Sequence, residues 1–347
     1  MKEMVKALLK KAFESNVIDG AVVLSKREDG YNYVLYTKFE DIDEISPFHP
    51  VMKINGAKIV SLITKDNELN KRFLFILKPC EVRAAVELKK LNQIDFNNSI
   101  FISYICPGVF EFKQGNSFND IDSFFNDFKN GAINESVRPV CKTCEFFAGE
   151  GADIVFDIFA EKFVFLTPKG EEFLDKLNIE KSDEFTKNKA FESIKEQREK
   201  NLKHYLNSYK NQFKDENKII EYFDICIKCN NCREACPICY CRQCYFESET
   251  FRYYPDSIKR KLSVKPALRL PTDKVLFQLG RVSHMAISCV GCGMCEDVCP
   301  MDIKVSQFFK YMGKNIQETF NYVPGINREE VLPLLTYREQ EFEEFED

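Results

Sequence analysis

Two cysteine runs decide how this chain folds: Cys226-Ile-Lys-Cys-Asn-Asn-Cys-Arg-Glu-Ala-Cys-Pro237 and Cys289-Val-Gly-Cys-Gly-Met-Cys-Glu-Asp-Val-Cys-Pro300. Each run has the spacing C-x2-C-x2-C-x3-C-P, which is typical of bacterial ferredoxins with two 4Fe–4S clusters. In such proteins the fourth cysteine of each run binds the cluster of the other run. We therefore predict that one cluster is bound by Cys226, Cys229, Cys232 and Cys299, and the other by Cys289, Cys292, Cys295 and Cys236.

Zinc is the alternative metal for these cysteines. A structural zinc site uses two C-x2-4-C pairs, and it needs neither a third cysteine at the same spacing nor a Cys-Pro step.

The N-terminus, Met1-Lys2-Glu3-Met4, leads into a charged helical pattern rather than an apolar signal core. The longest apolar runs are far shorter than the roughly 20 residues that cross a bilayer. We therefore expect a cytoplasmic protein without a membrane span, in which 15 cysteines indicate metal binding rather than disulfides.

The first 180 residues alternate between short apolar strands and helical patterns. Arg72 to Leu77 and Ser99 to Ile105 are predicted strands, and Glu81 to Leu91 is a predicted helix between them. This alternation is typical of a mostly parallel sheet covered by helices. A length of 347 residues predicts two or three domains, and a net charge of −5 gives no indication of nucleic acid or of an anionic membrane as a partner.

From these patterns we expect four segments. They are an α/β domain over residues 1–180, a helical linker over 181–220, an α+β two-cluster ferredoxin-like domain over 221–312 with an insert at 238–288, and a C-terminal tail over 313–347.

Four more cysteines lie in the α/β region. Cys80 and Cys106 each follow a predicted strand, and Cys141 and Cys144 form a C-x2-C loop. Because the carboxyl ends of parallel strands gather at one edge of a sheet, we predict that these four thiolates hold a third 4Fe–4S cluster there. The alternative is that Cys80 and Cys106 are small buried hydrophobic residues. Arg83, which follows Cys80 in the same predicted helix, is a candidate for contacting a flavin phosphate.

The insert between the two runs holds three cysteines whose role stays open: Cys239, Cys241 and Cys244. They belong either to a further metal site or to a set of reduced thiols packed beneath the clusters. A basic stretch that includes Arg252 and Arg269 follows them. It is interpreted as a solvated surface, with docking of an acidic redox partner as the alternative.

Several of these motifs resemble a known family. The segment Cys226-Ile-Lys-Cys-Asn-Asn-Cys-Arg-Glu-Ala-Cys-Pro-Ile-Cys-Tyr-Cys-Arg-Gln-Cys244 is similar to the cysteine-rich segment of formate dehydrogenase β subunits from methanogens, and Gly280 to Met301 and Phe320 to Gly325 continue the similarity. Lys78-Pro-Cys-Glu-Val-Arg-Ala84 and Arg138-Pro-Val-Cys-Lys-Thr-Cys144 resemble the flavin-binding core of the wider β-subunit family of deazaflavin (coenzyme F420) hydrogenases and dehydrogenases.

The resemblance implies an oxidoreductase subunit with an α/β N-terminal flavin-type domain, FAD and several 4Fe–4S clusters. In that family FAD exchanges a hydride with the deazaflavin coenzyme and passes electrons singly through the clusters. The partners that this implies are other iron–sulfur subunits and a catalytic subunit of formate dehydrogenase, hydrogenase or heterodisulfide reductase type, in a hetero-oligomer. The alternative is a ferredoxin-like electron wire with no flavin and no catalytic activity of its own.

Overall fold

The computed structural model describes most of the chain. The described residues are 1–336 apart from 43, 66–69, 112–120, 187, 216, 252–253 and 266–272. Arg252, Arg269 and the end of the expected tail therefore lie outside the described residues. None of the helices in the described part combines the length and the apolarity that crossing a membrane would require.

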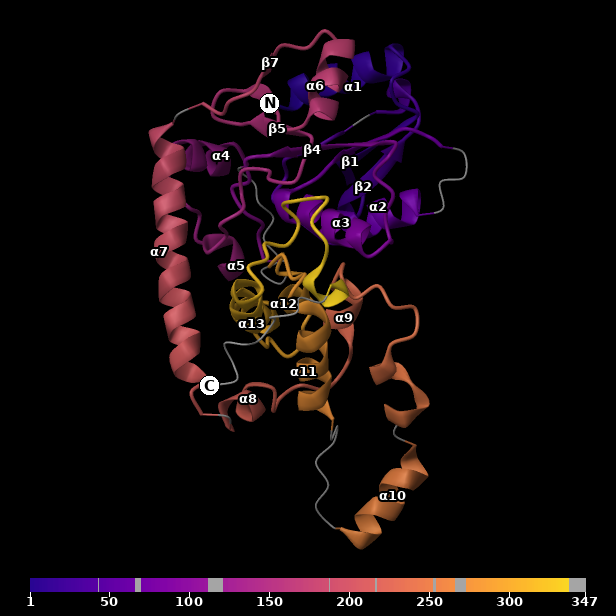
Figure 1. The fold of residues 1–347 in the computed structure, drawn as a ribbon, viewed down its shortest axis with the longest axis vertical. Coiled ribbons are helices and arrows are strands. Elements are labelled where there is room, and N and C mark those ends of the chain that lie inside the picture. Colours follow the sequence, from indigo (N-terminus) through magenta and orange to yellow (C-terminus); the bar gives the residue numbers. More distant parts are fainter. Residues whose placement is uncertain are drawn as a thin grey trace.

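A seven-stranded mixed sheet forms the N-terminal half of the molecule, with the order β2-β1-β3-β4-β5-β6-β7 (Figure 1). Four neighbouring pairs are parallel, while β1–β2 and β5–β6 are antiparallel hairpins. The sequence expectation of an α/β fold is confirmed as a mixed sheet. The strands are β1 (Gly20–Arg27), β2 (Gly30–Tyr36), β3 (Phe73–Ile76), β4 (Ser99–Tyr104), β5 (Ile154–Asp157), β6 (Lys162–Phe165) and β7 (Lys181–Ser182).

The two central strands, β3 and β4, are buried along their whole length, because helices cover both faces of the sheet. Helices α1 and α6 lie on one face and α2 and α3 on the other (Figure 1). The parallel register of β3 and β4, with Phe73 opposite Ser99, brings their carboxyl ends to one edge. The helices of this half are α1 (Lys2–Glu14), α2 (Gly56–Thr64), α3 (Pro79–Lys90), α4 (Ile121–Lys129), α5 (Pro139–Lys142) and α6 (Pro168–Lys176).

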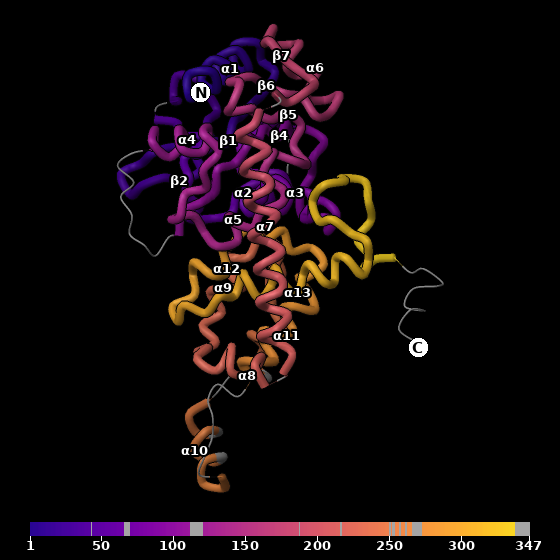
Figure 2. Tube along the Cα trace, turned by 90° about the vertical axis from the view of Figure 1, so that its left-hand side faces the viewer, coloured from indigo at the N-terminus to yellow at the C-terminus, as the bar shows by residue number. Residues whose placement is uncertain are grey.

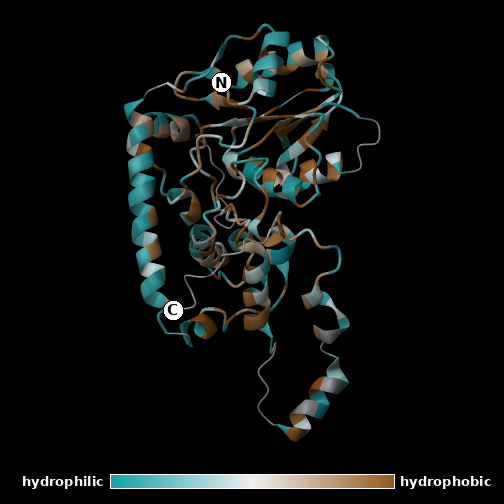
Figure 3. Ribbon diagram, in the orientation of Figure 1, coloured by the Kyte–Doolittle hydropathy of each residue, from teal (hydrophilic) through white to brown (hydrophobic). Residues whose placement is uncertain are grey.

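The helix α7 (Lys189–Gln212) connects the sheet to the cysteine-rich half. It contacts α4 and α5 on one side of the junction and α13 on the other, and most of its surface is hydrophilic (Figure 3). The regular elements of the cysteine-rich half are all helical in its described residues. They are α8 (Asn217–Tyr222), α9 (Asn231–Ala235), α10 (Pro255–Val264), α11 (Lys274–Met285), α12 (Met294–Asp297) and α13 (Val305–Thr319), with short 3-10 turns at Tyr245–Glu247 and Glu249–Phe251.

Residues 320–336, which we call the C-terminal strap, return from α13 to the sheet half and lie beside α3 (Figure 2). The fully buried carboxylate of Glu87 accepts hydrogen bonds from Tyr322 Oη at 2.6 Å and from the Gly325 N–H at 2.7 Å. Arg328 pairs with Asp153 at 2.8 Å. The strap therefore joins the two halves through buried polar contacts rather than lying loosely on the surface.

Candidate metal centre

The first cysteine group, Cys226, Cys229, Cys232 and Cys299, surrounds one cavity. Lys228 and Asn230 take positive φ angles of 52° and 62°, which curl the loop between the first three cysteines. The Lys228 N–H donates to Cys226 Sγ at 3.4 Å, and Gln278 Nε2 lies 3.8 Å from the sulfurs of both Cys226 and Cys232. Donors that point at sulfur are what a metal–sulfur cluster requires from its surroundings.

The second cysteine group, Cys236, Cys289, Cys292 and Cys295, surrounds a neighbouring cavity whose other walls are largely apolar. Gly291 and Gly293 have φ angles of 68° and 85° in the loop between these cysteines. At Gly293 a Cβ atom would lie 2.9 Å from Arg138 Cδ. Glycine is therefore needed here both for the backbone conformation and for the close approach of the buried arginine.

The two runs are crossed between the cavities in the way that the ligand assignment requires. Cys299, from the second run, lines the first cavity, and Cys236, from the first run, lines the second. The helices that precede them, α9 and α12, pack against each other. This contact places the last cysteine of each run at the cavity of the other run. The arrangement is consistent with the predicted binding of iron by these eight thiolates, which stays a prediction.

The described cysteines are not gathered in the way that a single metal ion requires. Within the described ranges, no group of three or more His, Cys, Asp or Glu side chains converges closely enough to hold one metal ion. Tetrahedral zinc would need four sulfurs at about 2.3 Å from a single point. A four-iron cluster is instead held by four thiolates around a cube, and four cysteines line each of the two cavities.

The predicted third group lies at the carboxyl edge of the sheet. Cys80 is in the first turn of α3 and Cys106 follows β4, while Cys141 is in α5 and Cys144 follows it. Burial raises the pKa of Cys80 well above its usual range, and its interactions with Cys292, Cys106 and Cys141 raise it further. Burial, followed by the neighbouring Cys141, raises the pKa of Cys106 to about 12. Such buried thiols stay neutral until a cation offsets the cost of ionising them.

The three cysteines of the insert have different surroundings. The Cys239 thiol hydrogen-bonds to Cys236 and lowers the pKa of Cys236 to about 6. Cys241 is exposed, and Cys244 lies beside Arg233. Cys239 therefore borders the second cysteine group, and Cys244 packs against the apolar cluster that contains Cys226, Cys232 and Cys299 of the first.

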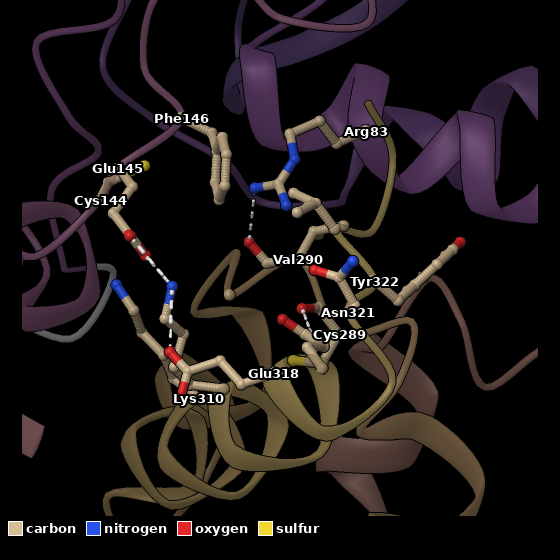
Figure 4. A pocket seen from close by; sticks show the side chains of 14 residues that line it. Arg83, Cys144, Glu145, Phe146, Cys289, Val290, Lys310, Glu318, Asn321 and Tyr322 are labelled. Atoms are coloured by element: carbon tan, nitrogen blue, oxygen red, sulfur yellow. Dashed lines mark hydrogen bonds and ion pairs between the residues drawn. The ribbon is translucent and has the colours of Figure 1, made fainter. Parts of the chain in front are cut away.

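Arg83 lies at the junction of the two halves (Figure 4). Its Nε and Nη2 donate to the Pro324 carbonyl at 2.9 and 2.7 Å, its Nη1 contacts the Val290 carbonyl at 3.5 Å, and its guanidinium stacks on Phe146 at 4.0 Å. The cavity next to it is also lined by Cys144 and Cys289. Arg83 thus holds the C-terminal strap and the second cysteine loop to α3, and contact with a flavin phosphate stays a prediction.

Three polar residues near the cysteine groups were not assigned a role from the sequence, although Arg138 and Arg281 lie in segments that carry the family resemblance. Gln278 and Arg281 point from α11 toward the first and second groups, and Arg138 donates to the Cys292 carbonyl at 2.8 Å. All three are buried polar residues on apolar-looking segments. Their roles follow only from how α11 and α5 pack against the cysteine loops.

The comparisons with known proteins agree with this geometry. Residues 222–303 match the family described as a 4Fe-4S dicluster domain. The β subunit of an F420-dependent formate dehydrogenase from Methanocaldococcus jannaschii is 28% identical over 93% of this chain and 91% of its own. The subunit β of F420-dependent formate dehydrogenase 1 from Methanococcus maripaludis is 29% identical over 94% of this chain and 91% of its own.

A solved structure, the F420-reducing [NiFe] hydrogenase complex from Methanosarcina barkeri, is similar to 60% of this chain and 86% of the matched chain, with 17% identity and a TM-score of 0.43. That similarity is too low to support an argument about fold or function. The two formate dehydrogenase subunits match almost the whole chain. The resemblance predicted from the sequence is therefore confirmed: the chain contains a 4Fe–4S dicluster domain and is similar over nearly its whole length to the β subunits of F420-dependent formate dehydrogenases.

Proposed function

We propose that this chain is an iron–sulfur electron-transfer subunit of a formate dehydrogenase-type complex. The observation that carries the proposal is the crossed arrangement of eight cysteines around two neighbouring cavities. Clusters bound there would supply one-electron chemistry. The protein's own part is to hold the thiolates, to exclude water from the second cavity and to direct N–H donors at sulfur.

The three cysteine groups support a continuous route for electrons. Cys80 of the third group interacts with Cys292 of the second, and Cys144 and Cys289 line one cavity between these two groups. Cys236 and Cys299 interlock the second group with the first. A third cluster at the sheet edge would therefore follow the second one directly, and the first would form the other end of the route.

The first group provides the exit to a partner. Cys229 is exposed, and the neighbouring Ile225 and Ile227 are 55% and 52% exposed. Apolar side chains around an exposed ligand are suited to contact with another subunit, because burying them excludes water from the path of the electron. We propose that a catalytic or iron–sulfur partner subunit docks on this face.

A finer form of the proposal adds two components: a flavin bound at the sheet edge and a deazaflavin carrier that reacts with it. They rest on the similarity to the F420-dependent subunits. Three of the N–H groups of Arg83 are already directed at carbonyls. That observation favours the second candidate function, an electron wire without flavin, and the flavin content separates the two.

The test is the cofactor content of the anaerobically purified full chain. We expect inorganic sulfide and about 8 or 12 irons per chain, for two or three clusters, together with paramagnetic signals after reduction by dithionite. Bound flavin supports the finer form, and iron and sulfide without flavin support the wire. A colourless protein that contains zinc and no sulfide would contradict both.

Single substitutions then test the grouping. Cys299→Ser and Cys292→Ser should each lose about four irons, and each should remove a different cluster signal. Cys141→Ser should remove a third cluster without affecting the other two. Cys241→Ser is the matched control, because this exposed cysteine lines neither of the two cavities. Loss of one and the same signal in Cys299→Ser and Cys292→Ser would contradict the crossed assignment.

A further inference from the structure

Arg281 lies between the first and second cysteine groups. It projects from α11 and is 3% exposed. Its Nη2 donates to the Cys232 carbonyl at 3.1 Å, in the first group. The same side chain lines the cavity of the second group. It interacts electrostatically with Cys232 on one side and with Cys236 and Cys295 on the other, and also with Cys239 of the insert.

The described residues provide no carboxylate for this buried charge. Arg281 Nη1 donates to the neutral Gln278 Oε1 at 3.3 Å, its Nε has no hydrogen-bond partner within the described ranges, and its guanidinium lies 4.6 Å from the Phe309 ring. Burying a cation without a counter-ion carries a large desolvation cost. The anions that would compensate it are therefore expected in the two cavities that it borders.

Arg138 provides a contrast. It is also buried and also lies beside the second group, where it donates to the Cys292 carbonyl at 2.8 Å. Its guanidinium, however, forms an ion pair with the buried carboxylate of Asp297. The charge of Arg138 is thus largely balanced by a carboxylate, whereas Arg281 has only cysteines and the neutral Gln278 as polar side-chain neighbours within the described ranges.

We propose that Arg281 is a counter-charge shared by the two clusters, and that it raises the reduction potentials of both. This inference rests on the proposed function, since it requires clusters in both cavities. A cluster bound by four thiolates is an anion, and reduction adds one further negative charge to it. A fixed cation in a poorly solvated site stabilises the reduced form more than the oxidised form. Gln278, whose amide reaches only the sulfurs of the first group, would add a smaller effect there alone.

The experiment is a potentiometric titration of the anaerobic full chain, followed by electron paramagnetic resonance. Arg281→Met should lower both midpoint potentials, and Arg281→Lys, which keeps the charge, should stay near the wild type. Arg328→Met is the matched control, because Arg328 also stacks on phenylalanine rings but pairs with Asp153 at the sheet. It should leave both potentials unchanged. Unchanged potentials in a fully loaded Arg281→Met protein, or equal shifts in the Met and Lys variants, would overturn the inference.

Loading with iron separates this inference from the proposed function. A wild-type chain without iron and sulfide refutes the proposed function, while loaded variants with unaltered potentials refute only the role of Arg281. If Arg281→Met does not hold iron, the test is instead pulsed electron paramagnetic resonance on the wild type and Arg281→Lys, both labelled with 15N-arginine. Nitrogen couplings to both reduced clusters are expected in the wild type and should decrease in Arg281→Lys. Spectra identical in the two proteins would also overturn the inference.

Discussion

Replacing Glu87 by alanine should release the C-terminal strap from α3. The carboxylate is fully buried and accepts hydrogen bonds from Tyr322 Oη at 2.6 Å and from the Gly325 N–H at 2.7 Å. Both bonds go to Oε1, so Glu87→Ala removes them at once, together with the ion pair to Lys90 at 3.3 Å. The Gly325 amide then loses its acceptor, while the Tyr322 hydroxyl loses its acceptor but can still accept from Lys90 Nζ at 2.7 Å.

The size of the effect follows from these contacts. A hydrogen bond to a charged group contributes about 1.5–3 kcal/mol, and two such bonds to one carboxylate are not fully additive. We therefore expect the free energy of opening the strap to fall by about 3 kcal/mol. Because 1.4 kcal/mol corresponds to a factor of ten, the strap should open about a hundredfold more often. Glu87→Gln keeps a neutral acceptor and should show a smaller increase, of about tenfold.

Hydrogen exchange of peptides covering residues 320–336 measures this opening directly. Glu329→Ala is the control, because its ion pair with Lys89 lies on the same strap but is largely exposed. It should change the exchange little. Equal exchange rates in Glu87→Ala and the wild type would refute the reasoning, as would an equally large increase in Glu329→Ala.

The other predictions concern the cysteine loops and the core. Gly293→Ala should impair loading of the second cluster far more than Gly291→Ala, as measured by iron content, because both have positive φ but only Gly293 has atoms within 3 Å of the added Cβ. Burial, with a smaller effect of Lys78, lowers the pKa of His49 to about 4. Between pH 6.5 and about pH 4, His49 is protonated in the unfolded chain but stays neutral in the folded one. The free energy of unfolding should therefore fall by about 2 kcal/mol from pH 7 to pH 5. His49→Phe should remove that slope in urea unfolding. Phe308→Ala, at a fully buried ring, should lower the free energy of unfolding by about 3–5 kcal/mol in the same assay, and a loss below 1 kcal/mol would contradict its place in the core.

Part of the fold and of the site is contained in local sequence patterns. The apolar residues of β3 and β4 and the spacing of the cysteine runs depend on neighbours a few positions apart, so these elements were predictable. Arg281 was not predictable, because its surroundings come from loops around Cys232 and Cys295 that only the fold brings together. Arg83 was a candidate from the sequence, but its hydrogen-bond acceptor, Pro324, was not predictable because it lies 241 positions farther along the chain.

The predicted C-terminal tail shows the same limit of sequence patterns. Residues 320–336 have no regular periodicity, and their irregular composition is typical of a surface segment. Glu87, within α3, has an ordinary helical pattern around it and gives no indication of its distant partners. The buried contacts between the two segments exist only because α13 ends at Thr319 and directs the chain back across the junction.

The contact between Arg83 and Pro324 has a consequence for assembly in the cell. Arg83 emerges from the ribosome long before the carbonyl that it binds has been synthesised. The sheet half can therefore fold early, but its junction with the cysteine-rich half closes only when nearly the whole chain has been translated. Maturation factors that deliver iron and sulfide would meet an open junction until that moment, and a closed one afterwards.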